Sequence, residues 1–254
     1  MLIKVKNWIY SCLILFKKSV RQSLFLGMLY FTFSLFVIPT FAISIGEMKL
    51  SVAHIILPFI ALIYVHFYKE LDEKGNFELK YIFNILKIKF RPLLSIGGLS
   101  LIFATLASFV FYSDVGPKTE EIKSIAEYSQ KLLPTFIKII LIYIPFFMAV
   151  WFSPLLIVYN HYGVLKAVKS SLAGTLMFSI PLLLGWAILT GGFILIILLV
   201  SIFFSSLSFL NQNLISFLSS LFLLLSFTAY LSILFIFQYV SYKDIFGALK
   251  IKPS

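Results

Sequence analysis

Long apolar stretches alternate with short polar segments over the whole chain. A helix needs about 20 mostly apolar residues to cross a bilayer core about 30 Å thick, because each residue adds about 1.5 Å. Six stretches meet this requirement: residues 23–45, 50–67, 92–112, 132–159, 176–204 and 214–237. The pattern predicts an all-α polytopic membrane protein, with a single integral membrane domain over residues 1–254.

The last two predicted spans share one stretch, from Ser170 to Tyr242, that contains no Asp, Glu, Lys or Arg. This stretch is too long for a single crossing. Asn211-Gln212-Asn213 lies inside it, and clustered Asn residues favour a turn. The sequence therefore predicts two antiparallel spans joined at residues 211–213.

Two shorter segments have the periodicity of an amphipathic helix. In residues 77–91 the polar positions recur at spacings of four, three and four, at Lys80, Asn84, Lys87 and Arg91. Residues 4–18 have the same design, and a weaker copy covers Gly163 to Ser171. Each copy precedes two predicted spans, which indicates three transmembrane hairpins, each introduced by an amphipathic cytoplasmic interfacial helix. Chance similarity among basic, apolar segments is the alternative.

Basic residues are concentrated in alternate connections between the predicted spans. Lys and Arg near span ends are retained in the cytoplasm, so this side is predicted to be inside, with both termini. We expect these side chains to bind the membrane surface: Lys17, Lys18, Arg21, Lys80, Lys87, Arg91, Lys166 and Lys169. The opposite side carries Lys49, Lys118, Lys123 and Lys131, together with acids.

Composition supports lipid as the main solvent of this chain. The 254 residues are 61% hydrophobic and 12% charged, and the mean hydropathy is +1.03. The net charge of +11 is explained by attraction to anionic headgroups on the cytoplasmic side, so nucleic-acid binding is not needed to account for it. Cys12 is the only cysteine, which excludes a disulfide framework.

Few ionisable residues fall inside the predicted spans. Glu47, His54 and Lys138 all lie near outer span ends, where they are candidates for a small polar cluster. Ordinary interfacial residues, with Lys138 extending its stem to the headgroups, are the alternative. Asp244 follows the last span, and we expect it to pair with Arg91, Lys166 or Lys169.

Proline and small residues interrupt several spans. Pro145 and Pro154 fall in the fourth and Pro181 in the fifth. Broken helices line transporter sites, but kinks also serve helix packing. Ser100, Ala104 and Ser108 form a stripe of small residues on the third span, which favours a contact between helices.

Two stretches of sequence resemble a bacterial superfamily of six-span membrane proteins. Residues 152–171 read FSPLLIVYNHYGVLKAVKSS and include the motif positions Pro154, Gly163, Ser170 and Ser171. Residues 239–247 read YVSYKDIFG and include Tyr239, Tyr242 and Asp244. The first stretch is similar to the central signature of the YciC-like proteins and of the membrane domain attached to some glycerophosphodiester phosphodiesterases. The second resembles an uncharacterised branch of that superfamily. The resemblance implies six spans in the bacterial inner (plasma) membrane and no particular reaction.

No residue set in the sequence matches a known catalytic or metal-binding motif. We therefore expect no enzyme activity, no cofactor and no metal. The leading hypothesis is an envelope protein that organises membrane lipids or partner proteins through its basic inner face. The alternative is a small transporter, channel or lipid-moving protein.

Overall fold

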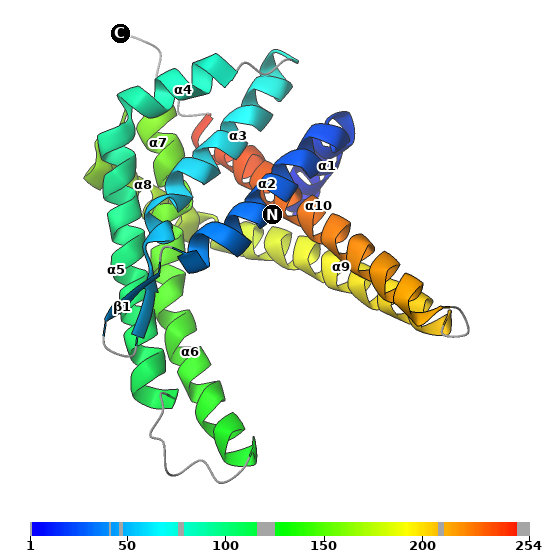
Figure 1. Ribbon diagram of the computed structural model, residues 1–254. Coiled ribbons are helices and arrows are strands. Elements are labelled where there is room, and N and C mark those ends of the chain that lie inside the picture. Colours follow the sequence, from blue (N-terminus) through cyan, green and yellow to red (C-terminus); the bar gives the residue numbers. More distant parts are fainter. Residues whose placement is uncertain are drawn as a thin grey trace. The chain divides into compact units, whose positions relative to one another are not determined.

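The computed structural model describes residues 2–40, 42–45, 48–75, 79–115, 125–207 and 211–247 (Figure 1). Most of these residues are helical, as the sequence predicts. The helices are α1 (Leu2–Lys18), α2 (Val20–Thr40), the 3-10 helix η1 (Val52–Ile55), α3 (Leu57–Glu73), α4 (Leu79–Ile88), α5 (Phe90–Val115), α6 (Ile125–Val150), α7 (Ser153–Tyr159), α8 (Val164–Met177), α9 (Ser179–Ser206) and α10 (Gln212–Phe246).

A small β-hairpin lies between α2 and η1. Strands β1 (Ala42–Ile45) and β2 (Met48–Ser51) pair antiparallel, with Ala42 opposite Ser51. The predicted helix over 23–45 is therefore wrong beyond Thr40, and the predicted helix over 50–67 begins only at Leu57. Hydrophobic periodicity alone does not separate a short strand from a helix, and this segment contains β-branched residues that favour strands.

Four segments of the described residues are long and apolar enough to cross a membrane. They are Phe90–Phe111, Pro134–Tyr159, Ser179–Ser206 and Gln212–Phe246, and they match the third to sixth predicted spans. Asn211 caps α10, because its side-chain oxygen accepts hydrogen bonds from the N–H groups of Asn213 (2.9 Å) and Leu214 (3.4 Å). The predicted division of the long apolar stretch at residues 211–213 is thus confirmed. The first and second crossings stay predictions.

The fourth predicted span is broken, not a single helix over 132–159. Helix α6 ends at Val150, and α7 begins at Ser153. Pro154 lies in the first turn of α7, where its missing N–H costs nothing within that helix but where it cannot continue the ladder of α6.

The three predicted amphipathic segments form separate short helices. A single residue separates each of them from the longer helix that follows: Ser19 between α1 and α2, Lys89 between α4 and α5, and Phe178 between α8 and α9. The order of a short helix followed by a long one therefore occurs three times in the described chain.

The helices form two compact units, each assembled from segments that are distant in sequence. Unit 1 comprises Met1–Phe33, Ile63–Glu78 and Phe178–Ser254, and unit 2 comprises Ser34–Leu62 and Leu79–Met177.

In unit 1, helix α1 packs against α9 and α10, and the latter two lie side by side (Figure 1). Buried residues on α1 recur at helical spacing: Val5, Trp8, Cys12 and Leu15. The Trp8 ring meets the Phe237 ring edge to face, with 5.9 Å between centroids. At Gly27 of α2 the backbones approach closely, because a Cβ there would lie 2.4 Å from the Thr228 carbonyl oxygen.

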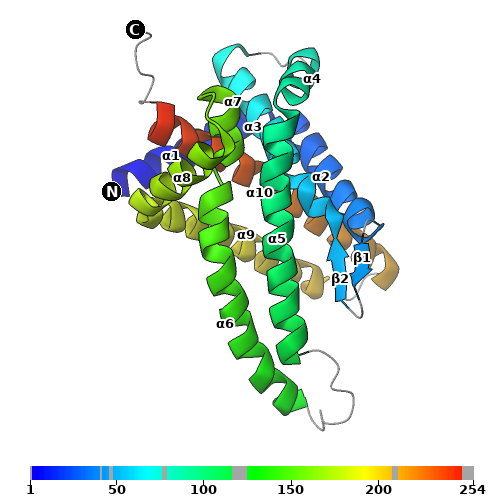
Figure 2. The same ribbon diagram turned by 90° about the vertical axis from the view of Figure 1, so that its left-hand side faces the viewer.

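In unit 2, helices α5 and α6 run side by side (Figure 2). Small residues on α5 make this close packing possible: Ser100 and Ala104 are buried, and the Phe103 and Phe146 rings stack at 4.8 Å. A Cβ on Gly97 would lie 2.2 Å from the Ile55 carbonyl oxygen of η1. These contacts support the packing interpretation of the small-residue stripe.

Candidate functional site

The last turns of α10 are tied to α1 by Asp244. Its Oδ2 accepts a hydrogen bond from Lys4 Nζ at 2.9 Å and another from Trp8 Nε1 at 3.2 Å. The predicted pairing of Asp244 with Arg91, Lys166 or Lys169 stays a prediction, because those three residues belong to unit 2 and Asp244 to unit 1. Because α1 packs along α10, it brings Lys4 to this carboxylate from the opposite end of the sequence.

Asp72, near the end of α3, makes a parallel tie to α10. Its Oδ2 accepts hydrogen bonds from Tyr239 Oη at 2.8 Å and from Lys243 Nζ at 2.6 Å. Partial burial of the carboxyl opposes ionisation, but the hydrogen bonds from Lys243 and Tyr239 outweigh it and hold the pKa of Asp72 below its ordinary value. We call Asp72, Asp244 and their four donors Lys4, Trp8, Tyr239 and Lys243 the carboxylate anchor.

An open pocket of about 440 Å³ lies beside the carboxylate anchor. Both carboxylates, the Lys243 ammonium, the Trp8 and Tyr239 rings, and polar side chains of α1 line it together with three aliphatic residues. The α1 polar residues are Asn7 and Ser11, and the aliphatic ones are Ile14, Leu15 and Val240.

Residues 239–247, the C-terminal of the two motifs found in the sequence, therefore have a structural role in this fold. Tyr239 and Asp244 join α10 to α3 and α1, respectively. Tyr242 is buried, and its ring lies 5.6 Å from that of Phe246. The sequence singled out these motif residues but missed Lys4, Trp8 and Asp72. Nothing in the sequence set Asp72 apart, because Glu70, Glu73 and Glu78 lie in the same segment.

Residues 152–171, the central of the two motifs found in the sequence, form a second polar contact. It lies in unit 2, where α8 meets the break between α6 and α7. The Ser171 hydroxyl accepts a hydrogen bond from the Phe152 N–H at 3.0 Å and donates one to the Met148 carbonyl at 2.8 Å. A continuous helix would join these same two backbone groups, since they are four residues apart. Ser171 is thus inserted into the helical ladder, which is a recognised cause of a sharp kink.

The Thr175 hydroxyl, one turn after Ser171, lies 3.2 Å from the Met148 carbonyl oxygen, and the Ser171 and Leu172 carbonyls compete for its single proton at 2.8 and 3.0 Å. Both side chains are buried. We call Ser171, Thr175 and the backbone groups of Met148 and Phe152 the hydroxyl anchor. Its hydrogen bonds satisfy the Phe152 N–H and the Met148 carbonyl, which lose their helical partner where the chain breaks between α6 and α7.

The other central-motif residues shape the connection from α7 to α8. Pro154 is buried in the first turn of α7, Gly163 precedes α8, and Ser170 is half-buried on α8. Between the helices, His161 has a φ of 54°, a left-handed conformation that allows the chain to turn sharply.

Most basic residues predicted to bind the membrane surface are exposed on the short helices or at the start of the long ones. Lys17, Arg21, Lys87, Arg91, Lys166 and Lys169 are exposed. Lys166 lies over the Tyr162 ring, 4.2 Å from its centroid. Lys18 is exposed as well and donates to the Leu71 carbonyl at 3.1 Å, and Lys80 belongs to α4.

The proposed outer polar cluster stays a prediction. Glu47 lies outside the described residues. His54 is half-buried in η1, and Lys138 is exposed on α6.

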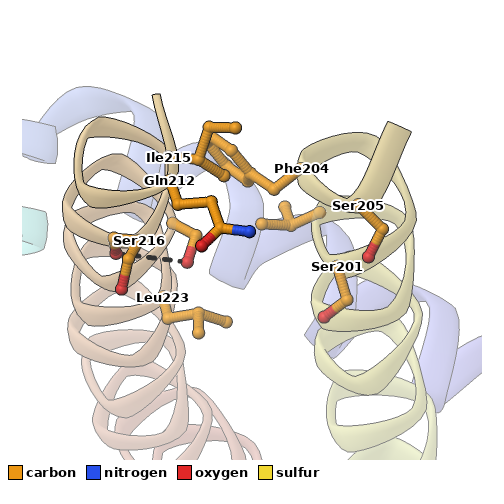
Figure 3. A pocket seen from close by; sticks show the side chains of 9 residues that line it. Ser201, Phe204, Ser205, Gln212, Ile215, Ser216 and Leu223 are labelled. Carbon is orange, nitrogen blue, oxygen red and sulfur yellow. Dashed lines mark hydrogen bonds between the residues drawn. The ribbon is translucent and has the colours of Figure 1, made fainter. Parts of the chain in front are cut away.

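A further pocket, of about 470 Å³, lies between α9 and α10 near their connection (Figure 3). Figure 3 shows Ser201 and Ser205 on one helix and Gln212 and Ser216 on the other, with the Gln212 amide reaching into the space between them. Apolar side chains such as Phe204 and Leu223 complete the wall.

The described residues contain no group of His, Cys, Asp and Glu side chains that fits a metal ion. The length and composition of the four long apolar helices are consistent with a helical membrane protein. No family model, curated protein or solved structure matches the chain.

Proposed function

We propose that this chain is a non-enzymatic protein of the bacterial inner membrane that binds anionic headgroups of the cytoplasmic leaflet and thereby organises lipids or partner proteins. The observation that carries the proposal is the exposure of basic side chains on the short helices that precede the long ones. Lys87 and Arg91 lie at the start of a candidate span, and Lys166 and Lys169 lie on the helix before another.

Helix α1 has the surface expected of an interfacial helix. Opposite its buried residues, Ile3, Lys6, Tyr10, Leu13 and Lys17 recur at spacings of three and four and are all exposed. Ile3 and Tyr10 are 75% and 65% exposed, which is unfavourable for apolar groups in water but favourable at a headgroup boundary. The two lysines can extend their charged ends toward phosphates while their stems remain among apolar groups.

The other short helices share this combination of exposed apolar and basic groups. On α4, Phe83 is 63% and Ile88 75% exposed beside the exposed Lys87. On α8, Leu165 is 68% exposed beside Lys166. Each basic residue near an anionic leaflet contributes about 1 kcal/mol of attraction. The resemblance to the YciC-like superfamily supports the same membrane assignment.

Lipid retention by the purified full-length chain tests the proposal. We would extract wild type and the variant Lys87→Gln/Arg91→Gln/Lys166→Gln/Lys169→Gln into mild detergent and count bound phosphatidylglycerol by native mass spectrometry. Wild type is expected to retain it in preference to phosphatidylcholine, and each lost charge should weaken binding about fivefold. The control is Lys138→Gln, which removes a lysine from the predicted outer side. Equal retention by all three proteins would overturn the proposal.

A transporter or lipid-moving function is the second candidate, because hydroxyl groups line the pocket between the apolar helices α9 and α10 (Figure 3). The broken fourth span adds less support, since its released backbone groups are bonded by Ser171 and Thr175. Dye or labelled-lipid movement in proteoliposomes tests this candidate. Movement above that of empty vesicles, lost in Ser201→Leu/Ser216→Leu, would establish it, and no movement above that level would exclude it.

A further inference from the structure

The pocket beside the carboxylate anchor contains hydrogen-bond acceptors that receive no hydrogen bond from the described residues of unit 1. All the hydrogen bonds that Asp72 and Asp244 accept from described residues reach their Oδ2 atoms. The Oδ1 atom of each carboxylate is therefore left with no donor among the described residues. Both side chains line the same pocket and are partly exposed, at 30% and 41%.

Two neutral side chains of α1 add to this set of acceptors. Asn7 and Ser11 line the pocket one helical turn apart, and no described residue forms a hydrogen bond with either side chain. The lining carries two carboxylates and one ammonium group, that of Lys243. Lys4 pairs with Asp244 from outside the lining, so the charges of the site balance. It is the open acceptors on two carboxylates that favour a ligand with several N–H donors, such as an ammonium group.

Lys243 gives the pocket a hydrogen-bond donor for an anionic group of the ligand. Its ammonium donates to Asp72 and has further N–H groups with no acceptor among the described residues. A phosphate is the natural partner for such a group. The aliphatic side chains of Ile14, Leu15 and Val240 offer an apolar wall beside these charges.

We propose that this pocket binds a primary ammonium joined to a phosphate, the headgroup chemistry of an aminophospholipid. The ammonium lies between Asp72 and Asp244, and the phosphate lies against Lys243. This inference rests on the proposed function, because it places the pocket at the end of α10 that the charge pattern predicts on the cytoplasmic leaflet. It adds a specific zwitterionic ligand to the non-specific attraction of anionic lipids.

The aromatic groups of the pocket favour a primary over a quaternary ammonium. Trp8 is bonded to Asp244 through its indole N–H and packs edge-on against Phe237. The Tyr239 ring carries the Lys243 ammonium 5.8 Å from its centroid. A trimethylammonium group needs open aromatic faces and has no N–H to donate to the carboxylates.

Binding of short-chain lipids to the full-length detergent-solubilised protein tests the proposal. Dihexanoyl phosphatidylethanolamine is expected to bind about tenfold more tightly than dihexanoyl phosphatidylcholine, because only the former donates hydrogen bonds to charged acceptors. Equal affinities would overturn the proposal. Free phosphoethanolamine separates the sources: affinity equal to that of the lipid assigns a soluble ligand, and much weaker affinity assigns the lipid.

Variants of α1 link the binding to this pocket without breaking the ion pairs. Asn7→Leu/Ser11→Leu fills the polar side of the pocket and leaves Asp72, Asp244 and their donors in place, so the preference for phosphatidylethanolamine should disappear. Tyr10→Leu, an exposed position of the same helix that does not line the pocket, is the matched control and should retain it. An unchanged preference in Asn7→Leu/Ser11→Leu would show that this pocket is not the site.

The two proposals fail separately. Removal of the basic residues Lys87, Arg91, Lys166 and Lys169 should weaken phosphatidylglycerol retention and leave phosphatidylethanolamine selectivity intact. If phosphatidylglycerol retention proves independent of these residues while selectivity persists, only the proposed function fails. If selectivity is absent while retention depends on them, only the pocket assignment fails.

Discussion

The hydroxyl anchor of unit 2 and the carboxylate anchor of unit 1 differ in the charge and burial of their polar side chains and in the groups that these side chains bind. The former uses neutral groups, fully buried, to bond backbone atoms that a helix break has released. The latter uses charged groups, partly exposed, to tie the end of one helix to two others. Loss of a buried hydrogen-bond partner costs more than loss of an exposed ion pair. Water can solvate the charged group that remains at the surface, but it does not reach a backbone group that remains unpaired in the interior.

Ser171→Ala is expected to have the largest effect on stability. It removes the acceptor that Ser171 provides to the Phe152 N–H and the nearer side-chain donor to the Met148 carbonyl, at a cost of about 2 kcal/mol. The melting temperature in detergent measures this loss, and Ser170→Ala, one residue away and half-buried, is the matched control. If the two variants melt alike, the inserted hydroxyl does not stabilise the break.

Thr175→Val should cost about 1 kcal/mol, less than Ser171→Ala. Val keeps the shape of the side chain and removes only its hydroxyl, while Ser171 continues to donate to the Met148 carbonyl. Thermal unfolding of Thr175→Val, Ser171→Ala and the double variant reports whether the two hydroxyls act together. A cost for Thr175→Val above that for Ser171→Ala would reverse the roles assigned to them.

Asp244→Asn should destabilise by about 1 kcal/mol or less, because both side chains of the Lys4–Asp244 pair are more than 40% exposed. A double-mutant cycle with Lys4→Met isolates the energy of the pair, which should fall as salt is raised. A coupling energy of zero at low salt would show that the pair does not hold the end of α10.

Acidification should produce the smallest effect, through Asp72. Its pKa is held below the ordinary value of 3.8, so its ion pair stabilises the fold above that pH. The contribution declines as the pH falls from the ordinary pKa through the lower folded one. Wild type should therefore lose stability relative to Asp72→Asn below about pH 4. Parallel pH profiles of the two proteins would contradict this assignment.

The sequence predicts those features that depend on local pattern. Long apolar stretches identified α5, α9 and α10, and Asn211-Gln212-Asn213 located the turn between the last two. Pro154 pointed to the interruption of the fourth span. The β-hairpin was missed because residues 42–45 continue the apolar run of the preceding helix, and periodicity does not discriminate over so short a window.

The two anchors depend on contacts between segments that are distant in sequence. Asp244 was recognised as an isolated acid, but its partner Lys4 becomes available only once α1 packs along α10. Ser171 was noted as a motif residue, but its insertion requires α8 to approach the break between α6 and α7. Sequence pattern thus identified these residues without assigning their partners.

Cysteine accessibility on either side of α5 tests the central claim most directly, that basic helices lie on the cytoplasmic side of a membrane-spanning bundle. Burial raises the pKa of the native Cys12 thiol to about 12, so it should stay unreactive. Lys87→Cys precedes the candidate span Phe90–Phe111, and Lys118→Cys, outside the described residues, follows it in sequence. An impermeant maleimide should label Lys118→Cys in intact cells, and Lys87→Cys only after permeabilisation. Labelling of both from the same side would contradict the account.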